Sequence, residues 1–162
     1  MDKIVINGGK RLNGEISIQG AKNSVLPILV ATLLVNGVSV IHNCPGLSDV
    51  DATIKILEFL GCVVTREGST IIVDSTGVNR THVPDELMRE MRSSVVFLGA
   101  IIGRMGKASL STPGGCEIGL RPIDLHLKAL RQMGIVIEDS GGIISCDGSN
   151  IKSAEIHLDF PS

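Results

Sequence analysis

The chain has 162 residues, of which 43% are hydrophobic and 20% charged, so its length and composition fit a folded protein with a buried core. It has no tryptophan or tyrosine and a formal net charge of -2, which argues against base stacking and against electrostatic attraction to nucleic acid or an anionic membrane surface. No secretory signal pattern opens the sequence and no apolar run is long enough for a membrane span, so we expect a cytoplasmic protein.

The first predicted elements are two short strands and a buried helix. Residues 4–7 and 15–19 have strand-like composition, and apolar residues alternate with polar ones in the second segment. Residues 24–35 are nearly all apolar, which is typical of a helix buried on every side, and Gly37 ends this segment.

A strand, an amphipathic helix and a hairpin are expected next. The strand covers residues 38–41. Ser48 is predicted to cap the helix, with Asp51 completing a variant capping box, and Gly61 suits the position just past its end. Residues 62–74 are predicted to form a β-hairpin.

The second half of the chain repeats this order of elements. After a short helix at 84–90, a nearly all-apolar helix covers about 94–105 and a strand covers 108–111. An amphipathic helix then begins at Pro122, and a hairpin follows over 135–146. The sequence therefore predicts an α/β protein built from a duplicated unit.

The two units align residue by residue, except in one loop. Before the amphipathic helix Gly37 matches Gly106. After its start the spacing between matched residues is about five longer, so the second unit carries an insertion of about five residues. The insertion lies in the loop that holds Cys116 and Arg121, which the first unit does without. Three further pairs follow the longer spacing: Asp51 and Asp124, Gly61 and Gly134, Asp74 and Asp147.

The inserted loop has the composition of an anion site with a reactive thiol. Residues 113–126 run from a glycine-rich stretch into a helix start, where backbone N–H groups attract anions. Cys116 in that loop should have a lowered pKa. The alternative is that Cys116 is an ordinary buried cysteine.

The repeat also predicts a second group of anion-binding residues. Lys22 and Asn23 stand at the start of one apolar helix, and Arg92 stands at the matching start of the other. Cations beside helix N-termini bind anions well, although solvated lysines and surface ion pairs remain alternatives. Asp124 and His126 are explained equally well as a first-turn carboxylate and a helix-face residue.

The remaining cysteines carry no sign of chemistry. Cys44, Cys62 and Cys146 lie in or beside apolar segments and are predicted to be ordinary buried thiols. The sequence has no C-x-x-C pair, Gly-x-Gly-x-x-Gly motif or Walker A motif, which disfavours a zinc knuckle and a Rossmann or P-loop nucleotide site. We expect no cofactor.

A third copy of the unit would begin near residue 161, where the sequence ends. We therefore expect a fragment of a longer protein that exposes apolar surface and tends to associate.

Three segments resemble the bacterial UDP-N-acetylglucosamine enolpyruvyl transferases. They are Gly20-Ala21-Lys22-Asn23, Met91-Arg92-Ser93-Ser94 and the stretch 113–126, with its Gly-Gly-Cys and Arg-Pro-x-Asp-Leu-His patterns. The resemblance covers the whole chain and implies an inside-out barrel of six β-α-β-α-β-β units, with helices inside and sheets outside. Residues 1–20 would then belong to an absent C-terminal domain. Residues 21–162 would supply two of three units of the other domain, at about 21–85 and 86–160.

The resemblance also implies a reaction and its residues. The enolpyruvyl group of phosphoenolpyruvate moves to the 3-hydroxyl of UDP-N-acetylglucosamine, without metal, in the first committed step of peptidoglycan synthesis. Cys116 matches the family's proton donor and the target of the antibiotic fosfomycin. The matched substrate-binding residues are Lys22, Asn23, Arg92, Arg121, Pro122, Ile123, Asp124, Leu125, His126 and Ser162.

Two features separate this chain from a complete enzyme. Phe160 and Pro161 occupy the region where some family members have a lysine near the diphosphate. The family's aspartate base and further arginines lie in the part that is not present, so this chain alone is expected to be inactive. The alternatives are a sister transferase acting on shikimate 3-phosphate and a scaffold that kept the fold without catalysis.

Overall fold

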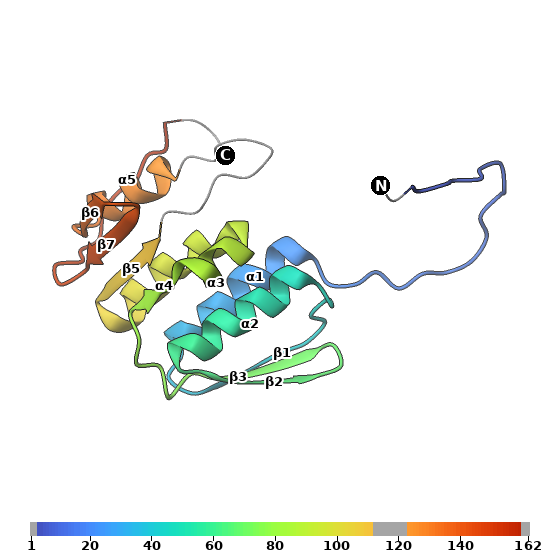
Figure 1. Cartoon of the computed structure of the whole chain (residues 1–162), viewed down its shortest axis with the longest axis horizontal. Helices are drawn as coiled ribbons and strands as arrows, with labels where there is room; N and C mark the ends of the chain where they lie inside the picture. Colours follow the sequence, from blue (N-terminus) through green and yellow to red (C-terminus); the bar gives the residue numbers. More distant parts are fainter. Residues whose placement is uncertain (1–2, 112–122, 160–162) are drawn as a thin grey trace.

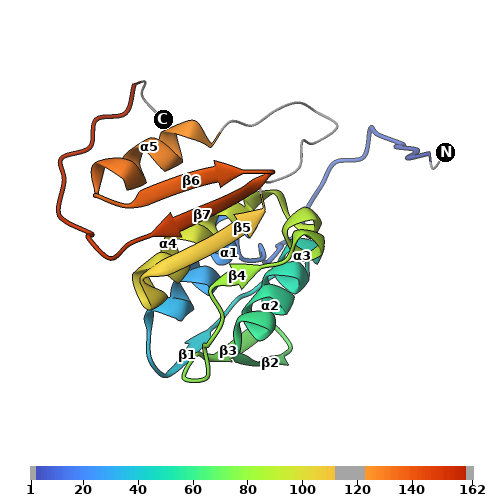
Figure 2. The same ribbon diagram turned by 60° about the vertical axis from the view of Figure 1, so that its left-hand side comes forward.

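The structure is a computed structural model that describes residues 3–111 and 123–159. Most of its helices pack together in the middle with the two sheets outside them, and the last helix lies apart from the others beside the second sheet (Figures 1 and 2). The α/β class and the repeated order of elements predicted from the sequence are confirmed, and so are the inner helices and outer sheets that the family resemblance implies. Within the described residues both sheets are open.

The first unit contains one apolar helix, one amphipathic helix and a three-stranded antiparallel sheet in the order β1-β3-β2. Gly61 ends α2 in the left-handed conformation with φ 108°, as expected for a residue past a helix end. The elements are α1 (Lys22–Ala31), η1 (Thr32–Leu34), β1 (Val38–Ile41), α2 (Ser48–Leu60), β2 (Val63–Glu67) and β3 (Thr70–Asp74).

The second unit repeats this arrangement and adds one strand. Its sheet has the order β4-β5-β7-β6, in which the short β4 pairs parallel with β5 and the other pairs are antiparallel. The elements are β4 (His82–Val83), α3 (Asp85–Glu90), η2 (Arg92–Val95), α4 (Val96–Met105), β5 (Lys107–Ser111), α5 (Asp124–Gln132), β6 (Val136–Ser140) and β7 (Ile143–Asp147).

Matching backbone contacts confirm the alignment of the two units. Gly61 and Gly134 both have positive φ, and a Cβ on either would approach a backbone carbonyl oxygen within 2.4 Å and 2.6 Å respectively. These oxygens belong to Gly77 and Asn150, which match each other at the same spacing. Only glycine fits such a contact, so both units need one at this place.

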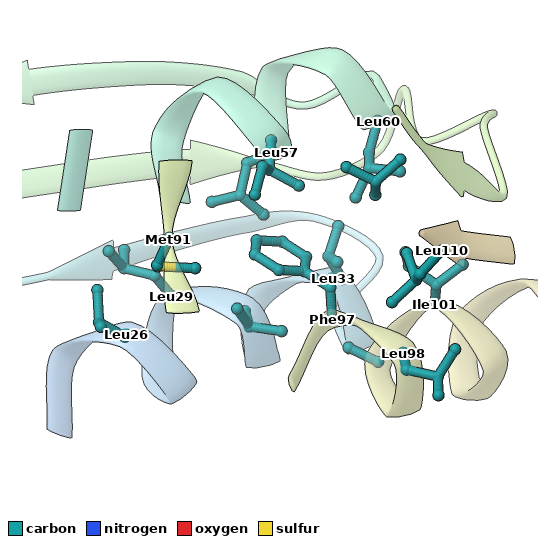
Figure 3. Packing of buried hydrophobic residues seen from close by; sticks show 14 of the residues in the cluster. Leu26, Leu29, Leu33, Leu57, Leu60, Met91, Phe97, Leu98, Ile101 and Leu110 are labelled. Atoms are coloured by element: carbon teal, nitrogen blue, oxygen red, sulfur yellow. The ribbon is translucent and has the colours of Figure 1, made fainter. Parts of the chain in front are cut away.

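The core lies between the helices and the inner faces of the sheets. Figure 3 shows the Phe97 ring of α4 among side chains of α1, η1 and α2, including Leu29, Leu33 and Leu57. These four side chains are at most 1% exposed. Each fully buried side chain of this size contributes roughly 1.5–3 kcal/mol through the apolar surface it removes from water.

The two strands predicted near the N-terminus are wrong. Residues 3–19 form no strand and extend away from the folded body (Figure 1), and Ile4 and Ile18 are 90% and 91% exposed. Strands need partners, and no described strand pairs with this segment. The apolar side chains of this segment are therefore exposed, because no described element packs against them.

The ends and faces of two helices also differ from expectation. α1 begins at Lys22, two residues before the predicted start, so Pro27 lies inside the helix and not in its first turn. Ile28 remains 47% exposed, because α1 buries one side and leaves another uncovered by the described residues. Ser48 is the first residue of α2 and makes no capping hydrogen bond, so the predicted capping box is also wrong.

The described residues contain no helix that is both long and apolar enough to cross a membrane.

Candidate functional site

The exposed start of α1 holds two of the predicted site residues. Lys22 is the first residue of this helix and Asn23 the second, and both are exposed. Free backbone N–H groups at this end carry a partial positive charge, which the Lys22 ammonium reinforces. Lys22 Nζ lies 2.8 Å from Asp49 Oδ2, in the first turn of α2. The ammonium is therefore held by a neighbouring helix while half of the side chain stays open to solvent.

Arg92 begins the matching helical segment of the second unit, as the repeat predicts. Its backbone starts η2, which leads directly into α4. Ser94 inside η2 is fully buried, and its hydroxyl donates to the carbonyl of Met88 at 3.1 Å. This bond ties the start of η2 to α3, so the backbone that bears Arg92 is fixed to the folded body.

The first turn of α5 places the next four site residues with different exposures. Ile123, the residue before the helix, packs against the core, and Leu125 is half-buried. The Asp124 carboxylate is exposed at the helix N-terminus, where the helix dipole favours a negative charge. This turn therefore presents one anionic group to solvent and anchors itself with apolar ones.

The His126 ring is the polar group of this turn that packing does not satisfy. Its Nε2 atom is buried and accepts or donates no hydrogen bond among the described residues. Burial lowers the pKa of His126, so its imidazole is neutral at pH 7. A buried ring nitrogen without a partner is costly, which makes His126 a candidate to meet a ligand or a loop residue.

Among the described residues, Asp124 lacks the cationic partner that its counterpart in the first unit has. Its counterpart Asp51 accepts a hydrogen bond from Arg66 at 2.8 Å, and the same guanidinium binds the carbonyl of Pro45 at 3.1 Å. Asp139 stands in the second unit where Arg66 stands in the first, in the same register of the hairpin. The second unit has thus replaced the structural cation by an acid, and Asp124 is not neutralised in the same way.

The remaining predicted site residues lie outside the described residues. These are Cys116, Arg121, Pro122 and Ser162. The bounds of the flanking elements still confirm the longer connection, which spans 42–47 in the first unit and 112–123 in the second.

The three other thiols are buried, as predicted. Cys44, Cys62 and Cys146 are at most 6% exposed. Burial raises the pKa of the Cys62 thiol to about 11, and it also raises the pKa of the other two. None of these thiols is suited to act as a thiolate at neutral pH.

No metal-ligand cluster accompanies these residues. Among residues 3–111 and 123–159 there is no group of three or more His, Cys, Asp or Glu side chains placed to hold an ion. A cavity of about 570 Å³ at the second sheet is lined by residues such as Lys107 and Ser145 and contains none of the predicted site residues.

No feature of the sequence points to Asp49, the residue whose carboxylate holds the Lys22 ammonium. Asp49 lies where the spacing between the two units changes, so comparison of the units matches no residue to it. The contact joins residues 27 apart in the chain, and only the packing of α1 against α2 brings them together.

Comparison with known proteins shows that the chain is similar to 1-carboxyvinyltransferases. A sequence profile of EPSP synthase (3-phosphoshikimate 1-carboxyvinyltransferase) matches residues 6–162. The chain is 58% identical over 162 residues to UDP-N-acetylglucosamine 1-carboxyvinyltransferase 2 of Caldanaerobacter subterraneus subsp. tengcongensis. It is 44% identical over 162 residues to UDP-N-acetylglucosamine 1-carboxyvinyltransferase of Desulfatibacillum aliphaticivorans. All of this chain is covered in both cases, but only 39% of each relative.

Solved structures share the fold at low identity. The enolpyruvyl transferase NikO from Streptomyces tendae superposes with a TM-score of 0.74 at 23% identity, over 89% of this chain and 32% of that one. EPSP synthase from Acinetobacter baumannii gives a TM-score of 0.69 at 17% identity, over 92% of this chain and 35% of that one. At these identities the likeness shows the fold alone.

Proposed function

The chain belongs to the EPSP synthase (3-phosphoshikimate 1-carboxyvinyltransferase) family, and on that premise we propose that it is part of a cytoplasmic UDP-N-acetylglucosamine 1-carboxyvinyltransferase. The reaction transfers the enolpyruvyl group of phosphoenolpyruvate to the 3-hydroxyl of UDP-N-acetylglucosamine and releases phosphate, for peptidoglycan synthesis. The observation that carries the proposal is the 58% identity to a relative of that name over the whole of this chain.

The chemistry proceeds by addition and then elimination. The sugar hydroxyl gives its proton to a base from the C-terminal domain, and its oxygen bonds to C2 of phosphoenolpyruvate while C3 takes up a proton, which gives a tetrahedral ketal phosphate. A base then removes a proton from C3, the electron pair restores the double bond, and the C2–O bond to phosphate breaks so that phosphate leaves. In this proposal Cys116 supplies the proton to C3, as its place in a glycine-rich loop before a helix start favours.

Fixed cations stabilise the phosphate and carboxylate of phosphoenolpyruvate in this proposal. Lys22, Arg92 and Arg121 take this role, because a charge held in place before the reaction needs no reorganisation during it. The exposed ammonium of Lys22 at the start of α1 and the backbone position of Arg92 at the start of η2 support the assignment.

The sugar nucleotide is bound by the loop and by the first turn of α5. Asn23 contacts it at the reacting centre, and Asp124 and His126 present an exposed carboxylate and an unpartnered ring nitrogen to it. The remaining contacts come from Arg121, Pro122, Ile123, Leu125 and Ser162.

The chain accounts for part of this site. It spans 39% of the length of the curated relatives named above. We propose that residues 1–20 pack with a C-terminal domain, that this domain supplies the base and further arginines, and that the present chain alone is inactive. The six large apolar side chains that residues 3–19 expose support such packing: Ile4, Val5, Ile6, Leu12, Ile16 and Ile18.

The test is phosphate release by the full-length protein in the presence of phosphoenolpyruvate and UDP-N-acetylglucosamine. We expect release with this acceptor and none with shikimate 3-phosphate. Cys116→Ala should lower kcat by about 10²- to 10⁴-fold, the usual effect of losing a general acid. Cys146→Ala, which removes a buried thiol, is the matched control and should keep kcat.

Two outcomes would contradict the proposal. Release of phosphate from phosphoenolpyruvate with shikimate 3-phosphate as acceptor, and none with UDP-N-acetylglucosamine, would identify the sister transferase. No release with either acceptor, together with equal modification of all four thiols by fosfomycin, would favour a non-catalytic scaffold.

A further inference from the structure

The first turns of α2 contact both of the helix starts at which the cations are expected. Asp49, the second residue of α2, binds the Lys22 ammonium at 2.8 Å. Thr53 lies one turn further along the same helix and is fully buried. Its Oγ1 lies 2.8 Å from the carbonyl oxygen of Asp49 and 3.2 Å from Met91 Sδ. One short stretch of helix therefore connects the start of α1 with the residue before Arg92.

The contact of Thr53 with Met91 fixes backbone position. Met91 is 2% exposed, and it is the last residue before η2 begins at Arg92. The single hydroxyl hydrogen of Thr53 is donated to one of its two neighbouring acceptors at a time, and the other contact is made by packing. In either arrangement the Thr53 side chain sets the distance between α2 and the start of η2.

Neither contact is a requirement of the duplicated scaffold that the sequence shows. Thr53 corresponds to His126 at the spacing that holds after the insertion, so the second unit has no hydroxyl at this place. Asp49 lies where the spacing changes, and no residue of the second unit is matched to it. An exposed ion pair is worth only about 0–1 kcal/mol of stability, so the Asp49–Lys22 pair contributes little to folding.

We propose that Asp49 and Thr53 are positioning residues, which hold Lys22 and the backbone of Arg92 in fixed relation so that both cations meet one phosphoenolpyruvate. This inference rests on the proposed function. A lysine side chain loses up to about 2 kcal/mol of rotamer freedom when a ligand immobilises it. A lysine already held by Asp49 has lost much of that freedom before the ligand arrives, so less is lost on binding.

Whether removal of the Asp49 carboxylate weakens or tightens the binding of phosphoenolpyruvate distinguishes a positioning role from an effect of its charge alone. A carboxylate near an anion site repels the anion, so removing it should tighten binding if Asp49 acts only through its charge. Positioning predicts the opposite, because an unheld ammonium spends less time in the geometry that binds the phosphoenolpyruvate.

The experiment compares variants of the full-length protein. Asp49→Asn keeps the size of the side chain and removes its charge, and Thr53→Val keeps the shape and removes the hydroxyl. For each we would measure the KM for both substrates, kcat, and the Kd for phosphoenolpyruvate by calorimetry. We expect each variant to raise the KM and Kd for phosphoenolpyruvate by about 5- to 20-fold with a change in kcat below about 3-fold.

Two kinds of control separate this role from a structural one. Glu90→Gln breaks the comparable ion pair that Lys55 of α2 makes at 2.7 Å, and it should leave both constants unchanged. Thr53→Ser keeps the hydroxyl and should restore most of the affinity that Thr53→Val loses. If Thr53→Val does not fold, Asp49→Asn decides, because the Asp49 side chain lies at the surface.

The outcomes distinguish this inference from the proposed function. An Asp49→Asn variant with an unchanged or lower Kd for phosphoenolpyruvate would overturn the positioning role. A parent protein that binds phosphoenolpyruvate but releases no phosphate would refute the proposed function, while the Kd comparison still decides the role of Asp49. A parent that binds no phosphoenolpyruvate would overturn both.

Discussion

The four thiols should differ sharply in their reactivity toward iodoacetamide in the native protein. Cys62 is 6% exposed, and burial raises its pKa to about 11. Cys116 stands in the inserted glycine-rich loop, where a lowered pKa is predicted. Only the thiolate is alkylated, so the difference in pKa becomes a difference in rate.

The magnitude follows from the fraction of thiolate at pH 8. With a pKa of about 11, roughly one Cys62 side chain in a thousand is ionised, against roughly one in ten at the ordinary value of 9.0. The raised pKa therefore lowers the thiolate fraction of Cys62 about 100-fold. The greater nucleophilicity of a high-pKa thiolate offsets roughly a factor of ten of this loss, and poor access slows alkylation further. With the lowered pKa that its loop predicts, Cys116 should be alkylated at least about tenfold faster than Cys62.

Peptide mapping by mass spectrometry after timed alkylation measures the four rates separately. The rate at Cys62 should rise about tenfold per pH unit until the pH reaches about 11, because its thiol stays protonated below that value. Alkylation in concentrated urea is the control, in which all four thiols should react at similar rates. The reasoning fails if native Cys62 or Cys146 is alkylated at pH 8 as fast as Cys116.

Two further predictions concern the stability of the fold, measured as the free energy of unfolding in urea. In Gly68→Ala the added Cβ has no atom within 4 Å, so only the positive φ should lower the free energy of unfolding, by about 1 kcal/mol. In Gly61→Ala the φ is also positive and the added Cβ would lie 2.4 Å from Gly77 O, so the free energy of unfolding should fall clearly further. Equal losses would mean that the close approach is relaxed without penalty. Phe97→Ala opens a cavity at a fully buried position and should cost about 3–5 kcal/mol, while Val63→Ala at a 68% exposed position should cost less than about 1 kcal/mol. A loss at Phe97 no larger than at Val63 would contradict the packing of the core.

Much of the fold was predictable from local patterns. The two apolar helices, the two hairpins and the glycines that end α2 and α4 lie close to where periodicity and turn residues place them. These features depend on neighbouring residues, which interact in the same way in both units. The prediction that Gly37 ends the first apolar helix is wrong, because α1 ends at Ala31 and a short 3-10 turn over Thr32–Leu34 follows it.

The capping box at Ser48 is absent because the helix starts one residue earlier than predicted, with Leu47 as its N-cap and Ser48 already inside the first turn. The Asp51 carboxylate instead accepts a hydrogen bond from Arg66, which the sheet brings near.

The sequence by itself determined the duplicated unit, the helix starts that bear Lys22 and Arg92, and the insertion that sets Cys116 apart. These follow from comparing one half of the chain with the other, because two copies of one scaffold must share what packing requires. The tertiary structure alone decided that residues 3–19 form no strand here, since a strand exists only through a partner. It alone decided that α2 holds Lys22 through Asp49 and reaches Met91 through Thr53. Such contacts join residues that are distant in sequence, and their distances are set by how the helices pack, which no local pattern encodes.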